Sequence, residues 1–142
     1  MIVVDASVAV KWLVDEPDSD AAGILFRSDA VLMCREHAVG EIGEVLVRSC
    51  RRGTMTVDEV RRANSAIVNR LALKSPLPLI RLATTIALDA SVSFYDALYV
   101  AAAERWHVPP VGADARLVAS LAATPWRSRV ILLRDWRDTR DP

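Results

Sequence analysis

The sequence opens with an apolar run, Ile2-Val3-Val4, that ends abruptly in an acidic residue, Asp5. β-Branched residues without polar alternation are typical of a strand that is buried on both faces, and such strands belong to parallel sheets. In parallel α/β sheets, ligands gather at the carboxyl ends of the strands, which is where Asp5 would lie. The opening stretch therefore predicts a parallel sheet with an acid at its functional edge, and we expect further acids downstream.

The rest of the chain alternates short apolar runs with helical periodicity, which is the pattern of an α/β fold. It predicts a three-layer α/β/α domain around a parallel sheet of four to five short strands. After the first strand, further strands are expected at Val31–Cys34, Pro109–Gly112 and Val130–Leu133, with the proline-containing Leu77–Ile80 as an edge strand or strand start. The expected helices are Ser7–Val14, Ser19–Ser28, Glu36–Arg52, a helix capped at Thr56 whose apolar stripe reaches Leu71, Leu82–Ala90, Phe94–His107 and Ala115–Ala122.

Length and composition suit one domain. The 142 residues are 52% hydrophobic, which is enough to bury a core. We expect a single domain over residues 1–133 and a loosely held, charged tail over residues 134–142. No uncharged apolar stretch approaches the roughly 18 residues that span a membrane, and the N-terminus lacks a signal-peptide pattern, so we expect a cytoplasmic protein. Cys34 and Cys50 have no paired spacing, which favours reduced thiols over a disulfide or a zinc site.

Three aspartates stand where a helix is expected to begin. Asp5 follows the first strand, Asp114 follows the strand that ends near Gly112, and Asp96 lies in the first turn of the helix begun by Ser93. Parallel strands bring Asp5 and Asp114 to the same edge of the sheet, and a helix that starts at this edge brings Asp96 there too. Grouped carboxylates repel each other unless a positive charge lies between them, and all-oxygen ligands select Mg²⁺ or Mn²⁺.

Each acid also has a purely structural interpretation. The two strand-end aspartates are good N-caps for the helices that follow them, and Asp96 forms a capping box with Ser93. Glu41 lies within an expected helix, where it can form a surface ion pair with Arg48 or Arg52. Taken one at a time, such acids are more often caps or surface charges than ligands, so spacing alone does not assemble a site.

Four sequence blocks fall in an order that is typical of one protein family. They are Ile2–Val8, Glu41–Leu46, Phe94–Glu104 and Val111–Leu117. The second resembles a helix with the pattern E-x-x-N-x-L, and the fourth resembles a V-T-x-D-x-x-L signature. In this order, and in a chain of this size, the blocks resemble the PIN-domain ribonucleases, in particular the VapC-type toxins of bacterial toxin–antitoxin pairs, over residues 1 to about 133.

The resemblance implies a metal-dependent endoribonuclease. Asp5, Glu41, Asp96 and Asp114 match the family's acidic quartet, which implies that they bind one or two Mg²⁺ or Mn²⁺ ions. A metal-activated water would then hydrolyse an RNA phosphodiester bond, leaving a 5′-phosphate and a 3′-hydroxyl. The resemblance also implies a homodimer, a cognate antitoxin protein that blocks the site, and a structured RNA substrate such as transfer RNA or ribosomal RNA.

Two positions depart from the family pattern. Gly112 stands where a threonine or serine is common, so a supporting hydroxyl is missing, and Ser7 is the candidate to supply one. Glu44 stands where asparagine is common; it is an extra ligand or, as we favour, a charge paired with Arg48. The departure at Gly112 keeps open a second hypothesis, a catalytically impaired PIN-like module that only binds an antitoxin or RNA.

A cluster of arginines bears on RNA binding. Arg48, Arg51 and Arg52 end one expected helix, and Arg61 and Arg62 begin the next. They could form a basic rim for phosphates, or they could be solvated side chains of a helix hairpin whose C-terminal arginines complement the helix dipole. The formal net charge is zero, so no global field attracts nucleic acid.

A different enzyme class is also conceivable, a phosphatase or phosphotransfer domain with Asp5 as nucleophile. Such sites use a nearby lysine as phosphate partner, and Lys11 and Lys74 are poorly placed for that role in the sequence. His37 and His107 lack partners at metal-ligand spacing, so we expect neither in the site.

Overall fold

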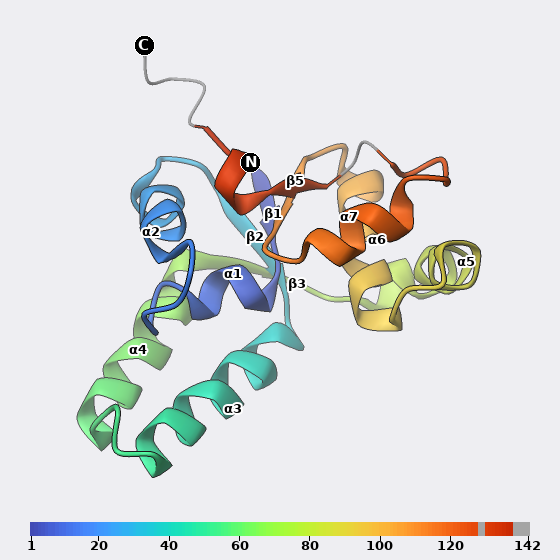
Figure 1. Ribbon diagram of the computed structural model, residues 1–142. Coiled ribbons are helices and arrows are strands. Elements are labelled where there is room, and N and C mark those ends of the chain that lie inside the picture. Colours follow the sequence, from blue (N-terminus) through green and yellow to red (C-terminus); the bar gives the residue numbers. More distant parts are fainter. Residues whose placement is uncertain (128–129, 138–142) are drawn as a thin grey trace.

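The computed structural model describes residues 1–127 and 130–137 and has the predicted three-layer α/β/α fold (Figure 1). One sheet of five parallel strands has the order β3-β2-β1-β4-β5, so the opening strand is central. In this position both edges of β1 are hydrogen-bonded and both of its faces are covered, which explains its uninterrupted apolar run. The strands are β1 Ile2–Val4, β2 Leu32–Arg35, β3 Leu71–Lys74, β4 Pro110–Gly112 and β5 Ile131–Leu132.

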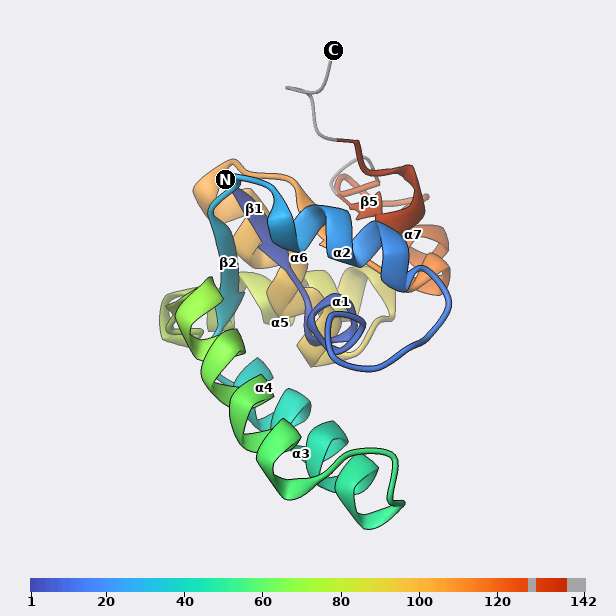
Figure 2. The same ribbon diagram turned by 90° about the vertical axis from the view of Figure 1, so that its left-hand side faces the viewer.

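Helices cover both faces of the sheet (Figures 1 and 2). Alternate residues of β1 point to opposite faces: Ile2 and Val4 belong to one core cluster, and Val3 belongs to the other. The first cluster is completed by α1 to α4 and the second by α5 to α7. The helices are α1 Ala6–Val10, α2 Ser19–Arg27, α3 Ala38–Arg51, α4 Val57–Arg70, α5 Ile80–Ala90, α6 Phe94–Trp106 and α7 Ala115–Leu121.

Helices α3 and α4 form a hairpin that projects from the body of the molecule (Figure 2). Gly53 has a φ of 74°, a left-handed conformation that stops α3, as the sequence predicts. The predicted capping box then starts α4: the amide of Thr56 donates to Oε2 of Glu59 at 2.7 Å, and the amide of Glu59 donates to Oγ1 of Thr56 at 3.2 Å. Local sequence signals therefore define this hairpin.

Two expectations for the middle of the chain are wrong. Leu71 does not continue the apolar stripe of a helix, because α4 ends at Arg70 and Leu71 begins β3. The segment Leu77–Ile80 is not a strand: Leu77–Leu79 form a 3₁₀ turn, η1, that leads into α5. Proline with its fixed φ and missing N–H suits the start of a helix, whereas β3 has no β-branched residue and owes its conformation to pairing with β2.

The C-terminal segment is held more firmly than the loose tail expected from residue 134. Leu133–Asp135 form a second 3₁₀ turn, η2, and Trp136 is only 9% exposed within the same core cluster as Ile2. The remainder of the expected tail, residues 138–142, lies outside the described residues.

Two expectations from composition can be compared with the structure. Cys34 and Cys50 are free thiols, as predicted. Among the described helices, none is by itself long and apolar enough to cross a membrane; the bent pair Leu77–Ala90 and Phe94–Trp106 meets the length and composition test only when both helices are counted together.

Candidate metal centre

Asp5 and Asp114 lie at the carboxyl ends of β1 and β4, and each caps the helix that follows. Oδ1 of Asp5 accepts hydrogen bonds from the Val8 amide at 2.8 Å and from Oγ of Ser7 at 2.6 Å. Oδ1 of Asp114 accepts from the Arg116 amide at 2.8 Å. The structural interpretation of both acids as N-caps is therefore correct. Capping occupies only one oxygen of each carboxylate, so it does not exclude a second role.

Asp96 lies in the first turn of α6, and one of its carboxylate oxygens is also hydrogen-bonded at the start of a helix. Oγ of Ser93 donates to Oδ2 of Asp96 at 2.7 Å and accepts from the Asp96 amide at 3.0 Å. This exchange holds the carboxylate at the start of the helix, which begins at the carboxyl edge of the sheet. Among the described residues, no hydrogen bond engages Oδ1 of Asp96.

Glu41 reaches the same region from the first turn of α3. Its Oε1 lies 3.7 Å from Nε2 of His37, and neither Arg48 nor Arg52 pairs with it. Burial and the charge of Arg35 lower the pKa of His37 to about 4, so the imidazole is neutral near pH 7 and the contact is not an ion pair. The neighbouring expectation, that Glu44 pairs with Arg48, is also wrong.

Asp5, Glu41 and Asp96 come from distant segments, and the charge of Asp96 reaches both Asp5 and Glu41. Burial raises the pKa of Asp5; hydrogen bonds from Ser7 and Val8 oppose the rise, and the negative charges of Asp96 and Glu41 add to it. Burial also raises the pKa of Glu41, with the charge of Asp96 adding to the effect and Arg35 opposing it. The three carboxylates therefore form one electrostatic group with excess negative charge.

Asp114 stands apart from this group. Its carboxylate turns toward Arg116, whose amide hydrogen bond is the main reason that the pKa of Asp114 is lowered. A pocket of about 500 Å³ connects Asp114 to one acid of this group, because the lining includes Glu41 and Asp114 together with Ser7, but neither Asp5 nor Asp96. Lys11 also lines this pocket, where its Nζ lies 3.2 Å from Glu16. The structure thus places three members of the predicted quartet within electrostatic reach, and the fourth, Asp114, shares a pocket with Glu41 but not with Asp5 or Asp96.

The donor chemistry of this edge fits a hard divalent cation. In residues 1–127 and 130–137, no group of three or more His, Cys, Asp or Glu side chains is arranged so that it could hold a metal ion as the side chains stand. The donors at hand are nevertheless all carboxylate oxygens, which Mg²⁺ and Mn²⁺ prefer. Because the raised pKa values of Asp5 and Glu41 show that their negative charges are unfavourable, a cation bound among Asp5, Glu41 and Asp96 would relieve that cost.

Gly112 packs directly against the carboxylate of Asp5. A Cβ atom added at Gly112 would lie 3.1 Å from Oδ2 of Asp5, closer than side chains ordinarily approach. Asp5 has little freedom to retreat, because Ser7 and Val8 both hold its Oδ1. The glycine therefore leaves room for this oxygen, and Ser7 supplies a hydroxyl to the acid from the other side, as the sequence suggests.

Sequence reasoning missed Arg35, the last residue of β2. Its side chain is fully buried, and the guanidinium carbon lies 3.6 Å from the centroid of the Tyr99 ring. Nη2 of Arg35 lies 3.1 Å from Nε2 of His37, a residue that the sequence does not place in the site either. The available signal was a charged residue that ends an apolar strand, the same signal that singles out Asp5.

The arginines expected to bind RNA lie at the distal end of α3. Arg48, Arg51 and Arg52 are all exposed, and Arg61, at the start of α4, pairs with Asp58 at 3.3 Å. The end of the hairpin therefore presents positive charge to solvent, beyond the acidic edge along the same helix.

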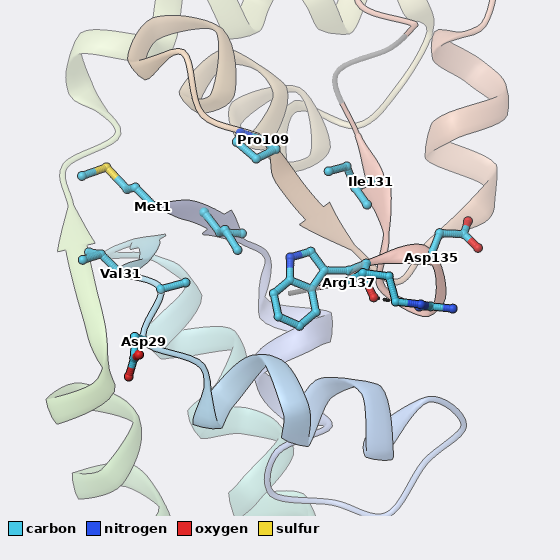
Figure 3. Close-up of a pocket in the computed structure, with 10 residues that line it drawn as sticks. Met1, Asp29, Val31, Pro109, Ile131, Asp135 and Arg137 are labelled. Carbon is cyan, nitrogen blue, oxygen red and sulfur yellow. Dashed lines mark hydrogen bonds between the residues drawn. The ribbon is translucent and has the colours of Figure 1, made fainter. Parts of the chain in front are cut away.

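A larger hollow, of about 650 Å³, lies at the opposite, amino end of the sheet (Figure 3). Met1, Val31 and Pro109, which precede or begin the central strands, line it together with Trp136. None of the four predicted acids lines this hollow, so the smaller pocket at the carboxyl edge is the candidate site.

Solved structures with the same fold include proteins of toxin–antitoxin systems. The chain is similar to PAE2754 from Pyrobaculum aerophilum (20% identity, TM-score 0.67, covering 94% of this chain and 83% of that one). It is also similar to VapC20 of Mycobacterium tuberculosis, described as a sarcin-ricin loop cleaving toxin (19% identity, TM-score 0.66, covering 84% of this chain and 95% of that one). A third similar structure is a chain of a toxin–antitoxin complex from Klebsiella pneumoniae (12% identity, TM-score 0.64, covering 94% of this chain and 98% of that one). At these identities the likeness establishes the fold alone.

A family model gives the assignment that the structural likeness does not. Among curated proteins, no relative matches the sequence. The model of the PIN domain, however, matches residues 2–120, a stretch that begins with β1 and includes all four acids of the predicted quartet. The chain therefore belongs to the PIN domain family.

Proposed function

We propose that this protein is a divalent-metal-dependent endoribonuclease that acts as the toxin of a toxin–antitoxin pair. PIN domains are typically metal-dependent nucleases, which agrees with the acidic edge of this chain. The observation that carries the proposal is the shared electrostatic group of Asp5, Glu41 and Asp96, drawn from β1, α3 and α6 to one edge of the sheet. Helix capping does not require these acids to lie near one another, and their mutual repulsion makes the grouping unfavourable unless a cation binds there.

Asp5, Glu41 and Asp96 are the residues proposed to hold the ion, with Asp114 as the fourth acid of the site. A bound Mg²⁺ or Mn²⁺ supplies Lewis-acid chemistry, polarising the phosphodiester and lowering the pKa of a coordinated water. The protein's own contribution is positional: Ser7 and Val8 fix one oxygen of Asp5, leaving Oδ2 beside Gly112.

Cations around the acids suit an RNA backbone. Lys11 and Arg116 line the same pocket as Glu41, and Arg48 and Arg51 lie further along α3. Phosphates on either side of the scissile bond would meet these side chains while the scissile phosphate lies over the acids. The substrate is proposed to be a structured RNA, such as transfer RNA or ribosomal RNA, because VapC20 of Mycobacterium tuberculosis is described as cleaving the sarcin-ricin loop.

A cognate antitoxin protein is the proposed regulator, as in the complex from Klebsiella pneumoniae. We further propose that the toxin is a homodimer and acts in the cytoplasm. Light scattering of the purified protein tests the dimer, and co-purification with the product of the adjacent reading frame tests the antitoxin.

The decisive experiment compares the wild type with Asp5→Ala and Asp96→Asn. Induced expression of the wild type should arrest growth and create new 5′-phosphate RNA ends, and sequencing of these ends identifies substrate and cleavage position together. Both variants should abolish cleavage and growth arrest, since each removes a proposed ligand, while circular dichroism shows that the fold survives.

Asp58→Asn is the matched control. Asp58 is an exposed acid of α4 that pairs with Arg61, so its loss should leave cleavage unchanged. Retained cleavage by purified Asp96→Asn protein would contradict the proposal.

A second function is favoured by one observation: the carboxylate of Asp114 is turned to Arg116 rather than to the other acids. A catalytically impaired PIN-like module that only binds an antitoxin or RNA would tolerate this arrangement. Tight antitoxin binding by a protein that cleaves no RNA with either Mg²⁺ or Mn²⁺ would select this alternative.

A further inference from the structure

Arg35 is the only charged side chain that is fully buried in the described part of the chain. It ends β2 beneath the acidic edge, with its guanidinium 3.6 Å from the centroid of the Tyr99 ring. Its Nε and Nη1 atoms are buried, and no acceptor among the described residues pairs with them. Burying a charge with unpaired donors is costly, so this residue calls for a compensating role.

The contacts of Arg35 lead to each of the three acid-bearing segments. The hydroxyl of Tyr99, whose ring lies against the guanidinium, accepts a hydrogen bond from the amide of Ala6, the residue that follows Asp5. The backbone carbonyl of Tyr95, which precedes Asp96, lies 3.4 Å from Nη2 of Arg35 and accepts from it.

The third segment is reached through a histidine. Nη2 of Arg35 lies 3.1 Å from Nε2 of His37, and this nitrogen lies 3.7 Å from Oε1 of Glu41. Arg35 thus contacts His37 and the carbonyl of Tyr95 directly, and it reaches the residue after Asp5 through Tyr99.

The positive charge of Arg35 partly neutralises the negative charge of the three acids. When all three carboxylates are ionised they carry a charge of −3, and the positive charge of Arg35 leaves −2, which a single divalent cation neutralises. An arginine keeps its charge even when it is buried, whereas a buried lysine readily loses its proton.

We propose that Arg35 is the resident counter-cation of the acidic group, a positioning residue that holds the three acid-bearing segments together and stands in for a second metal ion. The inference rests on the proposed metal-dependent function. This role of Arg35 implies that the wild-type site binds one divalent ion. It also implies that a variant without the guanidinium group binds divalent ions more tightly than the wild type.

Calorimetric titration with Mn²⁺ and thermal denaturation with and without Mn²⁺ test the proposal on the full-length protein, with no RNA present. Arg35→Met removes the charge at similar length. It should lower the melting temperature in metal-free buffer and bind Mn²⁺ about tenfold more tightly, because a nearby positive charge no longer repels the ion. Saturating Mn²⁺ should restore most of the lost stability. Arg35→Lys should bind Mn²⁺ with an affinity between those of the wild type and Arg35→Met, because a buried lysine readily loses its proton and supplies the positive charge only in part.

Arg70→Met is the matched control. Arg70 also lies over an aromatic ring, that of Phe26, and donates to the backbone carbonyls of Phe26, Ser28 and Ala30, and none of these contacts adjoins Asp5, Glu41 or Asp96. Its loss should cost stability that Mn²⁺ does not restore, with unchanged affinity for Mn²⁺.

The outcomes separate this proposal from the proposed function. If the wild type binds Mn²⁺ and Arg35→Met binds it equally or more weakly, Arg35 is not a counter-cation, while the metal-dependent function stands. If only Arg35→Met binds Mn²⁺, the role of Arg35 is supported and the metal dependence of the wild type fails; binding by neither protein overturns both. Should Arg35→Met be unfolded without metal, refolding on addition of Mn²⁺ supports the proposal, and failure to refold overturns it.

Discussion

At the scale of single residues, the aspartates of the acidic edge divide their two oxygens between two tasks. Oδ1 of Asp5 caps α1 and accepts from Ser7, and Oδ2 of Asp96 accepts from Ser93. The remaining oxygen of each is directed to no other described hydrogen-bond donor. Capping fixes a carboxylate in place before any ligand arrives, and a preorganised ligand binds with less loss of side-chain entropy.

Gly112→Ala tests how closely Asp5 is held. The added methyl group would lie 3.1 Å from Oδ2 of Asp5 and should displace that oxygen by a few tenths of an ångström. We expect weaker Mn²⁺ binding and slower RNA cleavage with a small change in melting temperature. Calorimetry and a cleavage assay measure the effect; Gly43→Ala, at a helix position with open space around it, is the control. Unchanged metal affinity in Gly112→Ala would show that Oδ2 is not a ligand.

Asp5→Asn tests the electrostatic cost of the acidic group. Because the pKa of Asp5 is raised above its usual 3.8, the folded state binds this proton more tightly than the unfolded chain, and ionised Asp5 opposes folding. That loss of stability is absent below pH 3.8 and complete above the raised pKa. The asparagine retains the Oδ1 acceptor for Ser7 and Val8.

In metal-free buffer, Asp5→Asn should therefore melt at a higher temperature than the wild type at about pH 8. The gain should shrink as the pH falls through the raised pKa toward 3.8. Thermal denaturation in EDTA across this range measures it, with Asp58→Asn as the exposed-acid control. A gain that is independent of pH would argue against the electrostatic cause.

At the scale of elements, α3 joins the acidic edge to the basic end of the hairpin. Glu41 lies in its first turn and Arg51 is its last residue, so a rise of about 1.5 Å per residue separates them by about 15 Å. A helix is stiff over this length, and it therefore sets a fixed spacing between the proposed catalytic acids and the proposed phosphate contacts.

Replacing Arg48, Arg51 and Arg52 together by glutamine should weaken RNA binding and leave Mn²⁺ affinity unchanged. For each of these arginines that binds a phosphate, the replacement should reduce the slope of log affinity against log salt concentration by about 0.7 for a single strand. Fluorescence anisotropy in an Asp96→Asn background measures binding without cleavage. Arg81→Gln, an exposed arginine of α5, is the control. An unchanged salt slope would mean that these arginines are only solvated ends of the hairpin.

At the scale of the whole molecule, the two ends of the sheet have separate tasks. The carboxyl end gathers acids, whereas Asp135 and Arg137 of the C-terminal segment line the hollow at the amino end (Figure 3). Trp136, between them, packs into the core. The last described residues therefore stabilise the first strand from the end opposite the site.

Trp136→Ala should cost about 3 to 5 kcal/mol of unfolding free energy, as expected for truncation of a buried aromatic side chain. Mn²⁺ affinity should not change, because Trp136 lies at the far end of the strands. Chemical denaturation and calorimetry measure the two quantities. A loss below about 1 kcal/mol would show that the segment beyond Leu133 contributes little, as a loose tail would.

The elements that the sequence predicts well are those with strong local causes. The apolar run of β1, the capping box at Thr56 and the stop at Gly53 all depend on residues within a few positions of each other. The α/β order and the parallel sheet follow from this pattern. The failures fall where tertiary contacts outweigh local preference. Leu71 begins a strand because it pairs with β2, and Trp136 is held in place because it packs into the core cluster.

The sequence by itself determined which acids stand at the ends of strands and the starts of helices, since capping chemistry and the position of a strand end are local properties. Only the tertiary structure decided that Asp5, Glu41 and Asp96 share one electrostatic field while Asp114 turns to Arg116, and that Arg35 is buried among the segments that carry them. Electrostatic interaction depends on distance through space and on exclusion of water, and neither quantity exists until the sheet has brought its strand ends together.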